Sequence, residues 1–287
     1  IVYNGSNPGV GLSTNGNTIS QCLPAKDTFF ISNTSNNPPG TIYIVTYNDG
    51  SPSQTFQHPP PPYFIHIFTS SSCGATGGTT PNTFFVRIRA ENPCGFTNAT
   101  VEPITTAQKP TANFTISPRD TVCTNTLVTL TNTSLTGEVV SNSGVCTNTI
   151  TQTWTITPGI SGVDYVVSPG SSLGLFPAGT PTVNLTFLTP GAYSIKLIVK
   201  NSSPSAICKT DSIIKMICIQ SPPNPSFSIS PQNGCAPVIV NTTNNSTNLP
   251  VCGTANTTWS VIKNSSICTP LSATDYQFIT ETSAHSS

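Results

Sequence analysis

Charge is scarce in this sequence. Its 287 residues include 10 Lys and Arg and 10 Asp and Glu, so 7% are charged, against about 25% in an ordinary soluble domain. The formal net charge of zero and a pI near 6.9 provide no basic field for a phosphate backbone, which argues against nucleic acid as a partner. Runs of 18 or more apolar residues are also missing, so the sequence predicts no transmembrane segment.

Residue types that carry catalysis are few and scattered. The histidines are His58, His66 and His285, and they form no H-E-x-x-H or paired-histidine spacing. The ten carboxylates show no D-x-D-x-D ladder, so neither a calcium loop nor a glycosidase dyad can be drawn. We therefore expect a protein that is not an enzyme and that holds no metal and no cofactor.

Two local patterns nevertheless deserve an interpretation. Residues 170–174 match the G-x-S-x-G elbow that would make Ser172 a hydrolase nucleophile, but no strand and helix flank them, so we interpret the match as chance. Asp49, within Asn48-Asp49-Gly50, is the best loop ligand for calcium in the chain. An ordinary Asn-Asp-Gly turn is the interpretation that we favour there.

Polar uncharged residues, proline and cysteine are abundant instead. There are 27 Pro and 20 Gly, but 36% of the residues are hydrophobic, which is enough to build cores. The 10 cysteines contain no C-x-x-C pair, so disulfides in an oxidising, extracellular setting are the favoured interpretation. The alternative is that several stay reduced and buried. The chain starts at Ile1 with no initiator Met, and we expect a processed product or an excerpt.

Internal repetition is the most informative pattern. Similar segments begin at Cys22, Cys123 and Cys235, which are 101 and 112 residues apart. Phe114-Thr-Ile-Ser-Pro recurs as Phe227-Ser-Ile-Ser-Pro. A period this long predicts an array of like domains, with modules at residues 1–107, 108–221 and 222–287. The third copy stops at Ser287, before the counterpart of residues 193–219, and we expect it to be C-terminally incomplete.

Each module shows the two-residue period of β-strands. Residues 182–187 and 193–199 alternate apolar with mostly polar side chains. Short strands between Gly, Pro and Asn turns predict an all-β fold of tandem immunoglobulin-like antiparallel sandwiches. One aromatic side chain should fill each core: Tyr43, Trp154 and Trp259. Proline-containing joints at 105–110 and 220–225 should be stiff, which predicts an extended rod.

Several segments resemble PKD (polycystic kidney disease) domains. The resemblance rests on residues 112–118, on Gly-Cys-Ala-Pro-Val-Ile-Val-Asn at 234–241, and on Gly-Ala-Tyr-Ser-Ile-Lys-Leu-Ile-Val at 191–199. Residues 47–52 are partly similar to the family's Trp-Asp-Phe-Gly-Asp-Gly stretch. The matching residues of the second module, 155–159, depart from that pattern. The resemblance covers essentially the whole chain.

Tandem PKD-like modules with spaced cysteines are similar to giant surface adhesins of gliding Bacteroidetes. This resemblance implies an adhesin stalk attached at the outer membrane, supporting adhesion and gliding motility after type IX secretion. The implied partners are a surface polysaccharide or other extracellular ligand, neighbouring modules, and the outer-membrane secretion or motility machinery. It also implies O-glycosylation at Thr121 and Ser212, because each follows an aspartate, at positions 120 and 211.

Sandwich topology converts cysteine positions into expected disulfides, since paired cysteines must lie at the same end of a module. The expected pairs are Cys123–Cys218, Cys146–Cys208, Cys22–Cys73 and Cys235–Cys268. Cys94 has no obvious mate, and Cys252 would pair with a cysteine after Ser287.

Two other functions stay open. The modules could be spacers or carbohydrate-binding accessory modules of a secreted protease or glycan hydrolase. Sugar binding needs a planar aromatic strip, and Tyr63, Phe64 and Phe68 alternate along their segment rather than forming one.

Overall fold

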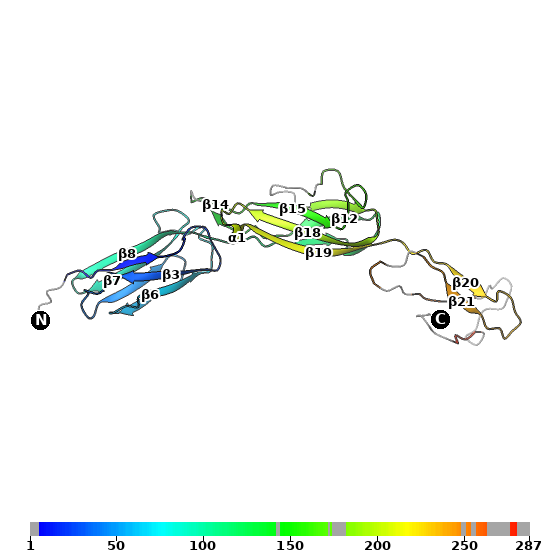
Figure 1. The fold of residues 1–287 in the computed structure, drawn as a ribbon, viewed down its shortest axis with the longest axis horizontal. Helices are drawn as coiled ribbons and strands as arrows, with labels where there is room; N and C mark the ends of the chain where they lie inside the picture. The colour runs from blue at the N-terminus through cyan, green and yellow to red at the C-terminus, as the bar shows by residue number, and fades with distance from the viewer. Residues whose placement is uncertain are drawn as a thin grey trace.

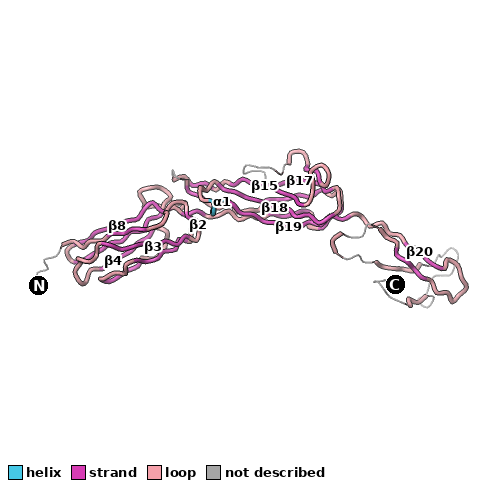
Figure 2. The backbone as a smooth tube through the Cα atoms, viewed as in Figure 1, coloured by secondary structure: helices cyan, strands magenta, loops and turns pink. Residues whose placement is uncertain are grey.

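The computed structural model shows three β units joined end to end (Figure 1). It describes residues 6–141, 144–171, 173, 182–247, 251–253, 257–262 and 276–279. Strands run along the length of each unit, and the first two units form a continuous arched rod (Figure 2). The predicted all-β fold of tandem immunoglobulin-like sandwiches is confirmed.

The first sandwich packs a three-stranded sheet against a four-stranded one, in the orders β1-β3-β6 and β5-β4-β7-β8. Its strands are β1 (Gly11–Thr14), β2 (Gln21–Cys22), β3 (Ala25–Ser32), β4 (Ile42–Tyr47), β5 (Gln54–Gln57), β6 (Tyr63–Phe68), β7 (Phe84–Asn92), β8 (Gly95–Ile104) and β9 (Thr106–Ala107). Tyr43, expected as the core aromatic residue, is fully buried between the two sheets.

The second sandwich has two four-stranded sheets, in the orders β10-β12-β17-β16 and β11-β19-β18-β15. Its elements are β10 (Phe114–Ser117), β11 (Thr121–Cys123), β12 (Leu127–Asn132), β13 (Val139–Val140), β14 (Cys146–Thr147), β15 (Ile150–Thr157), β16 (Tyr165–Val167), β17 (Thr182–Phe187), β18 (Gly191–Asn201), α1 (Ala206–Lys209) and β19 (Thr210–Gln220). Trp154 is 3% exposed and meets the Phe114 ring edge-on, with centroids 5.0 Å apart.

The alternation of side chains explains both cores. Along β18 every second residue from Tyr193 to Val199 is buried, and the residues between them are only half-buried. Because successive side chains of a strand point to opposite faces, one face fills the core and the other meets solvent. Valine and isoleucine supply 14 of the 30 residues of the two cores, which suits their preference for strands.

The third unit is different, because its described part has no closed core. It holds β20 (Phe227–Ser230) and β21 (Asn241–Asn244), an antiparallel pair whose residues are all exposed. Trp259 meets the ring of Phe227 edge-on at 5.5 Å but is only half-buried. Within the described residues Trp259 is therefore not enclosed as Tyr43 and Trp154 are, because no second sheet covers this pair there, and its place in a core stays a prediction.

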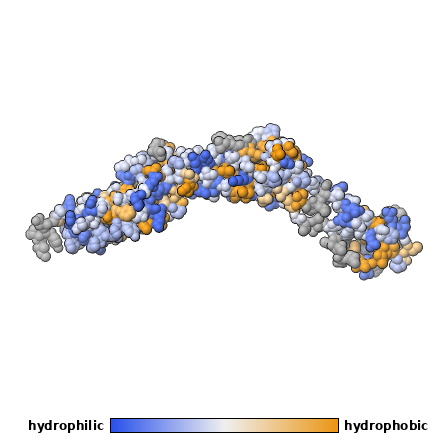
Figure 3. All heavy atoms as spheres, viewed as in Figure 1, coloured by the Kyte–Doolittle hydropathy of each residue, from blue (hydrophilic) through white to orange (hydrophobic). Residues whose placement is uncertain are grey.

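The surface that these units present is mostly polar. In Figure 3, blue and pale atoms are mixed with small orange patches along the visible face of the first two sandwiches. Orange areas also lie on the third unit (Figure 3), where Phe227, Ile239 and Ile262 are 63%, 68% and 87% exposed.

Candidate functional site at the joint between the first two sandwiches

The backbone itself ties the first two sandwiches together. β2 pairs in parallel with β9, the last strand of the first sandwich, so that Cys22 lies opposite Ala107. The next residue, Gln108, donates its N–H to the Glu138 carbonyl at 2.7 Å, and Thr111 and Leu135 exchange a further pair of hydrogen bonds. The segment between the sandwiches is therefore bonded to the 133–149 loop of the second one, and it does not behave as a free linker.

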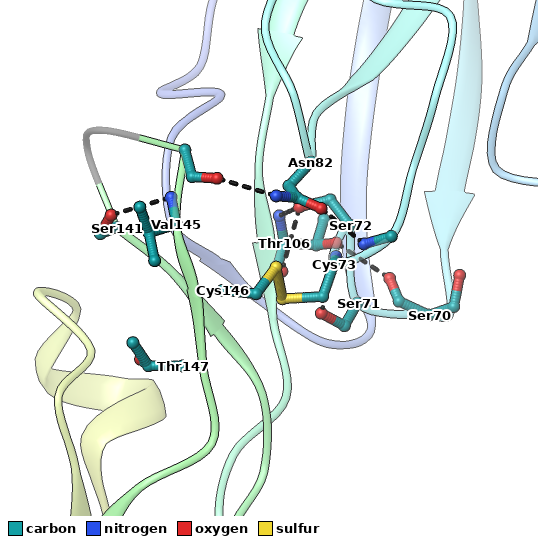
Figure 4. The surroundings of a disulfide bond; sticks show 12 residues. Ser70, Ser71, Ser72, Cys73, Asn82, Thr106, Ser141, Val145, Cys146 and Thr147 are labelled. Atoms are coloured by element: carbon teal, nitrogen blue, oxygen red, sulfur yellow. Dashed lines mark hydrogen bonds between the residues drawn. A yellow bond between two sulfur atoms is a disulfide. The ribbon is translucent and has the colours of Figure 1, made fainter.

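Two disulfides cross the same joint. Cys22 is bonded to Cys208, and Cys73 is bonded to Cys146, with Cα–Cα separations of 5.4 and 5.7 Å, inside the usual range of about 4.4–6.8 Å. In Figure 4 the second bridge lies between the 70–73 loop of the first sandwich and the start of β14. Beside it, the Asn82 amide donates to the Gly144 carbonyl at 2.8 Å.

These pairs correct the disulfides expected from sequence. We expected Cys22–Cys73 and Cys146–Cys208, each within one module, whereas the structure exchanges the partners across the joint. The physical reason is that the end of the first sandwich carrying Cys22 and Cys73 faces the end of the second that carries the other two cysteines. The short joint segment indicated that these two ends would meet, and that was the signal the sequence interpretation did not use.

The expected Cys123–Cys218 pair is also wrong. β11 and β19 run in parallel, and their register places Thr121 opposite Cys218 and Cys123 opposite Gln220. The two cysteines are thus two residues out of step, and Cys218 instead bonds Cys252 of the third unit, with Cα atoms 6.1 Å apart. Cys235 is exposed and unpaired, and its expected partner, Cys268, lies outside the described residues.

A small apolar cluster fills the joint beneath the first bridge. Ala107, Val139 and Cys208 are 1%, 2% and 0% exposed, and the half-buried Cys22 packs against them. This cluster belongs to neither sandwich core, since its members come from both units. Burial of its surface opposes separation of the two sandwiches by the hydrophobic effect.

Asp211 holds the joint segment against the second sandwich. Its carboxylate accepts hydrogen bonds from the Lys109 ammonium and the Ala112 N–H, both at 2.8 Å. Burial alone would raise the pKa of Asp211, but the hydrogen bonds from Lys109 and Ala112 outweigh it and lower the pKa below its ordinary value. The carboxylate is therefore charged at neutral pH and orients residues 109–112.

Two open clefts flank the joint. The larger, about 670 Å³, is lined by Leu23, Pro24, Thr69, Ser70, Ser71, Cys73, Gln108, Lys109 and Glu138. The smaller, about 330 Å³, is lined by Ile19, Thr80, Thr83, Pro103, Thr105, Ser141 and Gly144. Neither lining contains an aromatic ring on which a sugar could stack. The clefts are gaps between two docked sandwiches, and their residues are not arranged as a catalytic group.

Asp49 and His66 form a buried polar pair in the first sandwich. His66 Nε2 lies 2.7 Å from Asp49 Oδ2, and the two side chains are 8% and 4% exposed. Ser51 donates to the same carboxylate from its N–H and its hydroxyl. Burial would raise the pKa of Asp49, but the hydrogen bonds from His66 and Ser51 lower it below its ordinary value. These oxygens already have donors, and Gly50 at φ 88° makes the bend, so the turn interpretation suits Asp49.

Two other ionisable side chains adjoin this pair. The Tyr47 ring stacks on His66 with centroids 3.9 Å apart, and burial together with the Asp49 charge raises the pKa of Tyr47 to about 12. Asp27 faces His66 across β3 and β6, and burial raises its pKa in spite of hydrogen bonds from Gln21. No serine or cysteine nucleophile is hydrogen-bonded to His66 among the described contacts, so the group fits a buried polar tie between the two sheets.

The other described sequence candidates are on separate elements. His58 Nδ1 meets the Tyr43 hydroxyl at 3.0 Å, while Ser172 and His285 lie outside the described residues. Ser212 is exposed on β19 and Thr121 is half-buried on β11. Across the ranges that the structure describes, no group of three or more His, Cys, Asp or Glu residues could hold a metal ion. In the same ranges no helix has the length and apolarity to span a membrane.

Comparison with known proteins shows only distant likenesses. No model of a known protein family matches the chain, and no curated protein matches it. Among solved structures, the chain is similar to domains 3–5 of the extracellular part of Drosophila OTK, with 12% identity over 70% of this chain and 59% of that one, at a TM-score of 0.34. The chain therefore spans less than two thirds of that structure.

Two further likenesses are of the same kind. The three N-terminal domains of the Hoc capsid protein of bacteriophage RB49 match at 12% identity, over 86% of this chain and 72% of that one, with a TM-score of 0.31. The mouse nectin-like molecule 4 ectodomain matches at 10% identity, over 75% of this chain and 65% of that one, with a TM-score of 0.32. At such scores these likenesses carry no argument about function, which must come from the chain itself.

Proposed function

We propose that this chain is a non-enzymatic stalk segment of an extracellular cell-surface adhesin, built of PKD-like sandwiches that carry a binding tip away from the cell. The observation that supports this most is the first joint, where two disulfides and a buried cluster fix two sandwiches end to end. A stalk needs neighbouring modules that keep their direction, and a joint with this many independent ties restricts bending.

The cysteine chemistry supports the extracellular part of the proposal. Three described disulfides require an oxidising compartment, because cytosolic thiols are kept reduced. The low charge of the chain supports it too, since a protein with 7% charged residues and no net charge attracts few ions or polyelectrolytes nonspecifically.

The resemblance noted from the sequence supplies the finer proposal. The parent protein would be an outer-membrane-attached adhesin of a gliding bacterium, exported by type IX secretion and working with the motility machinery. Its tip would bind a surface polysaccharide or another extracellular ligand. Ser212, exposed on β19, is the more accessible of the two proposed O-glycosylation sites, and Thr121 stays a candidate.

An exchange experiment tests the spacer role. Residues 6–221 of the parent protein are replaced by two unrelated immunoglobulin-like sandwiches fixed at the same length, or are deleted. We expect the replacement to keep adhesion of cells to their substratum and the deletion to reduce it, while antibody labelling of intact cells shows equal display. Loss of adhesion with the equal-length replacement would instead mean that this segment itself contacts the ligand.

The same variants separate the adhesin from the alternative of spacer modules beside a protease or glycan hydrolase. In that case the deletion would lower hydrolysis of a macromolecular substrate by the parent protein and would leave adhesion unchanged. The deletion therefore gives opposite readouts for the two functions.

A further inference from the structure

The three described disulfides follow one rule. Each bridge joins two neighbouring units at the ends that face each other. Cys22–Cys208 and Cys73–Cys146 cross the first joint, and Cys218–Cys252 crosses the second. Among the described cysteines none is bonded to another in its own sandwich. The bridges therefore connect neighbours in the array and leave each sandwich core to be held by its own packing.

Two of the cysteines that remain unpaired lie at positions that correspond to disulfide-bonded cysteines in the neighbouring sandwich. Cys94, Cys123 and Cys235 are exposed and free. Cys94 lies in the turn between β7 and β8, and Cys208 lies in the corresponding turn between β18 and β19. The correspondence is structural, because β4-β7-β8 and β15-β18-β19 are the same run of antiparallel neighbours in the two sandwiches.

Cys123 corresponds in the same way to Cys22. Cys22 lies in β2, which runs parallel to the last strand of its sandwich, β9. Cys123 lies in β11, which runs parallel to the last strand of its own, β19. Each short strand leads directly into a long core strand, β3 or β12. Cys22 is bonded to Cys208, in the turn between β18 and β19 of the following sandwich. Cys123 has no such partner among the described residues.

The end of the sandwich that carries Cys123 is already docked against the third unit, which is an independent observation. Gln220 lies opposite Cys123 in the β11–β19 register, and its side-chain amide donates to the Cys252 carbonyl at 3.2 Å. Cys218, two residues away, is bonded to Cys252. The thiol of Cys123 therefore stands at an interface where the neighbouring unit is present.

We propose that Cys94 and Cys123 are halves of a repeated disulfide staple whose other halves belong to like sandwiches next in the array. Cys94 bonds a cysteine placed as Cys22 is, at the end of a preceding sandwich. Cys123 bonds a cysteine placed as Cys208 is, in the turn before the last strand of the next sandwich. At the repeat spacing of the sequence that turn falls after residue 287. The same rule assigns Cys235 to a unit that follows the third.

Staple formation is a balanced thiol–disulfide exchange with a disulfide oxidant, either a small-molecule disulfide or an exchange enzyme. The first thiolate attacks a sulfur of the oxidant, forms a mixed disulfide and releases one thiolate. The second cysteine loses its proton and displaces the remaining half. The two cysteines lose two electrons together, and the oxidant is reduced to two thiols.

Disulfide mapping of the full-length protein that contains this chain tests the proposal. The oxidised protein is treated with N-ethylmaleimide under denaturing conditions, digested without reduction and analysed by mass spectrometry. We expect the Cys94 and Cys123 peptides to be linked to peptides from outside residues 1–287, with no maleimide on either cysteine. The Cys22–Cys208 and Cys73–Cys146 peptides serve as internal positive controls.

Substitution of one half reveals the other. Cys123→Ser should make one cysteine outside residues 1–287 reactive to maleimide, and the matched variant Cys218→Ser should make Cys252 reactive instead. The proposal is overturned if Cys94 and Cys123 of the wild-type protein carry maleimide or a small thiol, or if they are linked to each other. The result is independent of the adhesin function, because a spacer beside an enzyme could carry the same staples.

Discussion

The second and third units contain the same pair of rings in different surroundings. In the second sandwich Phe114 and Trp154 meet edge-on at 5.0 Å, and both are buried. In the third, Phe227 and Trp259 meet edge-on at 5.5 Å, yet Phe227 is 63% exposed. The repeat motif therefore brings the two rings together locally, whereas their burial depends on something beyond the motif.

That additional element is the second sheet. In the second sandwich β18 and β19 extend the sheet that contains β15, and their inward residues Ile195, Leu197 and Ile217 are at most 1% exposed. The described part of the third unit has no counterpart of these two strands. The comparison indicates that the repeat motif brings the two rings into contact, and that strands such as β18 and β19 are needed to bury them and so stabilise the unit.

Truncation of the tryptophans should separate the two units most clearly. Trp154→Ala should lower the free energy of unfolding of the second sandwich by about 3–5 kcal/mol, because it empties a closed core. Trp259→Ala should cost about 1 kcal/mol or less, since it removes one ring pair that is open to solvent. Hydrogen exchange followed by mass spectrometry, resolved by unit, measures both.

Trp154→Phe is the matched control for that comparison. It keeps a ring against Phe114 and removes an indole N–H that has no partner in the described structure, so its cost should be well below that of the alanine variant. An equal loss for Trp154→Ala and Trp259→Ala would mean that the third unit has a core as closed as the second.

The second-largest expected effect is a difference between the two joints in their response to loss of one disulfide. Cys73→Ser removes one of two bridges at the first joint and should lower the stability of the joined pair by about 2–4 kcal/mol. Cys218→Ser removes the described bridge of the second joint. It should mainly increase the range of angles between the second and third units. Calorimetry measures the first effect, and small-angle scattering measures the second through the longest dimension.

Cys94→Ser in the 287-residue chain is the control for both cysteine variants, because Cys94 is exposed and unpaired here. It should change neither the transition nor the scattering profile. If Cys73→Ser and Cys218→Ser increased bending equally, the remaining disulfide, hydrogen bonds and buried cluster at the first joint would not stiffen it, contrary to our expectation.

The buried polar pair of the first sandwich should have a smaller effect. Asp49→Ala leaves the His66 ring and the Ser51 donors without their acceptor, and it should destabilise the first sandwich by about 1–3 kcal/mol. Glu91→Ala breaks the exposed pair with Arg89, whose N and O atoms are 2.9 Å apart, and should cost less than about 1 kcal/mol. Urea unfolding of both variants checks this order, and a reversed order would mean that the buried pair is dispensable.

The smallest expected effect is a pH dependence at the joint. Because the pKa of Asp211 is lower in the folded chain than its ordinary value of 3.8, its contribution to stability is present above that value. The contribution is lost as the pH falls through the folded pKa. Its partner Lys109 is half-exposed, so the size should be below about 1 kcal/mol. Thermal unfolding between pH 7 and 2 should show a shallower loss for Asp211→Asn than for the wild type.

The sequence predicts the units better than it predicts their connections. The two-residue period along residues 182–199 is a local property, and the structure shows the strands that it predicts. The positions of Tyr43 and Trp154 within the cores also follow from strand order. Whether Trp259 is buried depends on strands elsewhere in its unit, which the motif around it does not contain.

The disulfides were mispredicted for a physical reason. Sandwich topology indicates at which end of its module a cysteine lies, and each end faces both its own loops and those of the next module. Choosing between them needs the distance across the joint and the register of neighbouring strands, such as the offset of β11 against β19 that separates Cys123 from Cys218. Neither quantity is encoded in residue spacing.

The Cys22–Cys208 bridge also determines where a mechanical load travels. When the two ends of the chain are pulled, tension passes from residue 22 directly to residue 208 through the sulfur atoms and bypasses the 185 intervening residues. A second shortcut runs from Cys218 to Cys252. Both sandwich cores lie almost wholly within the bypassed loop, so a stretched filament of such units would hold its length like a covalent chain instead of lengthening by domain unravelling.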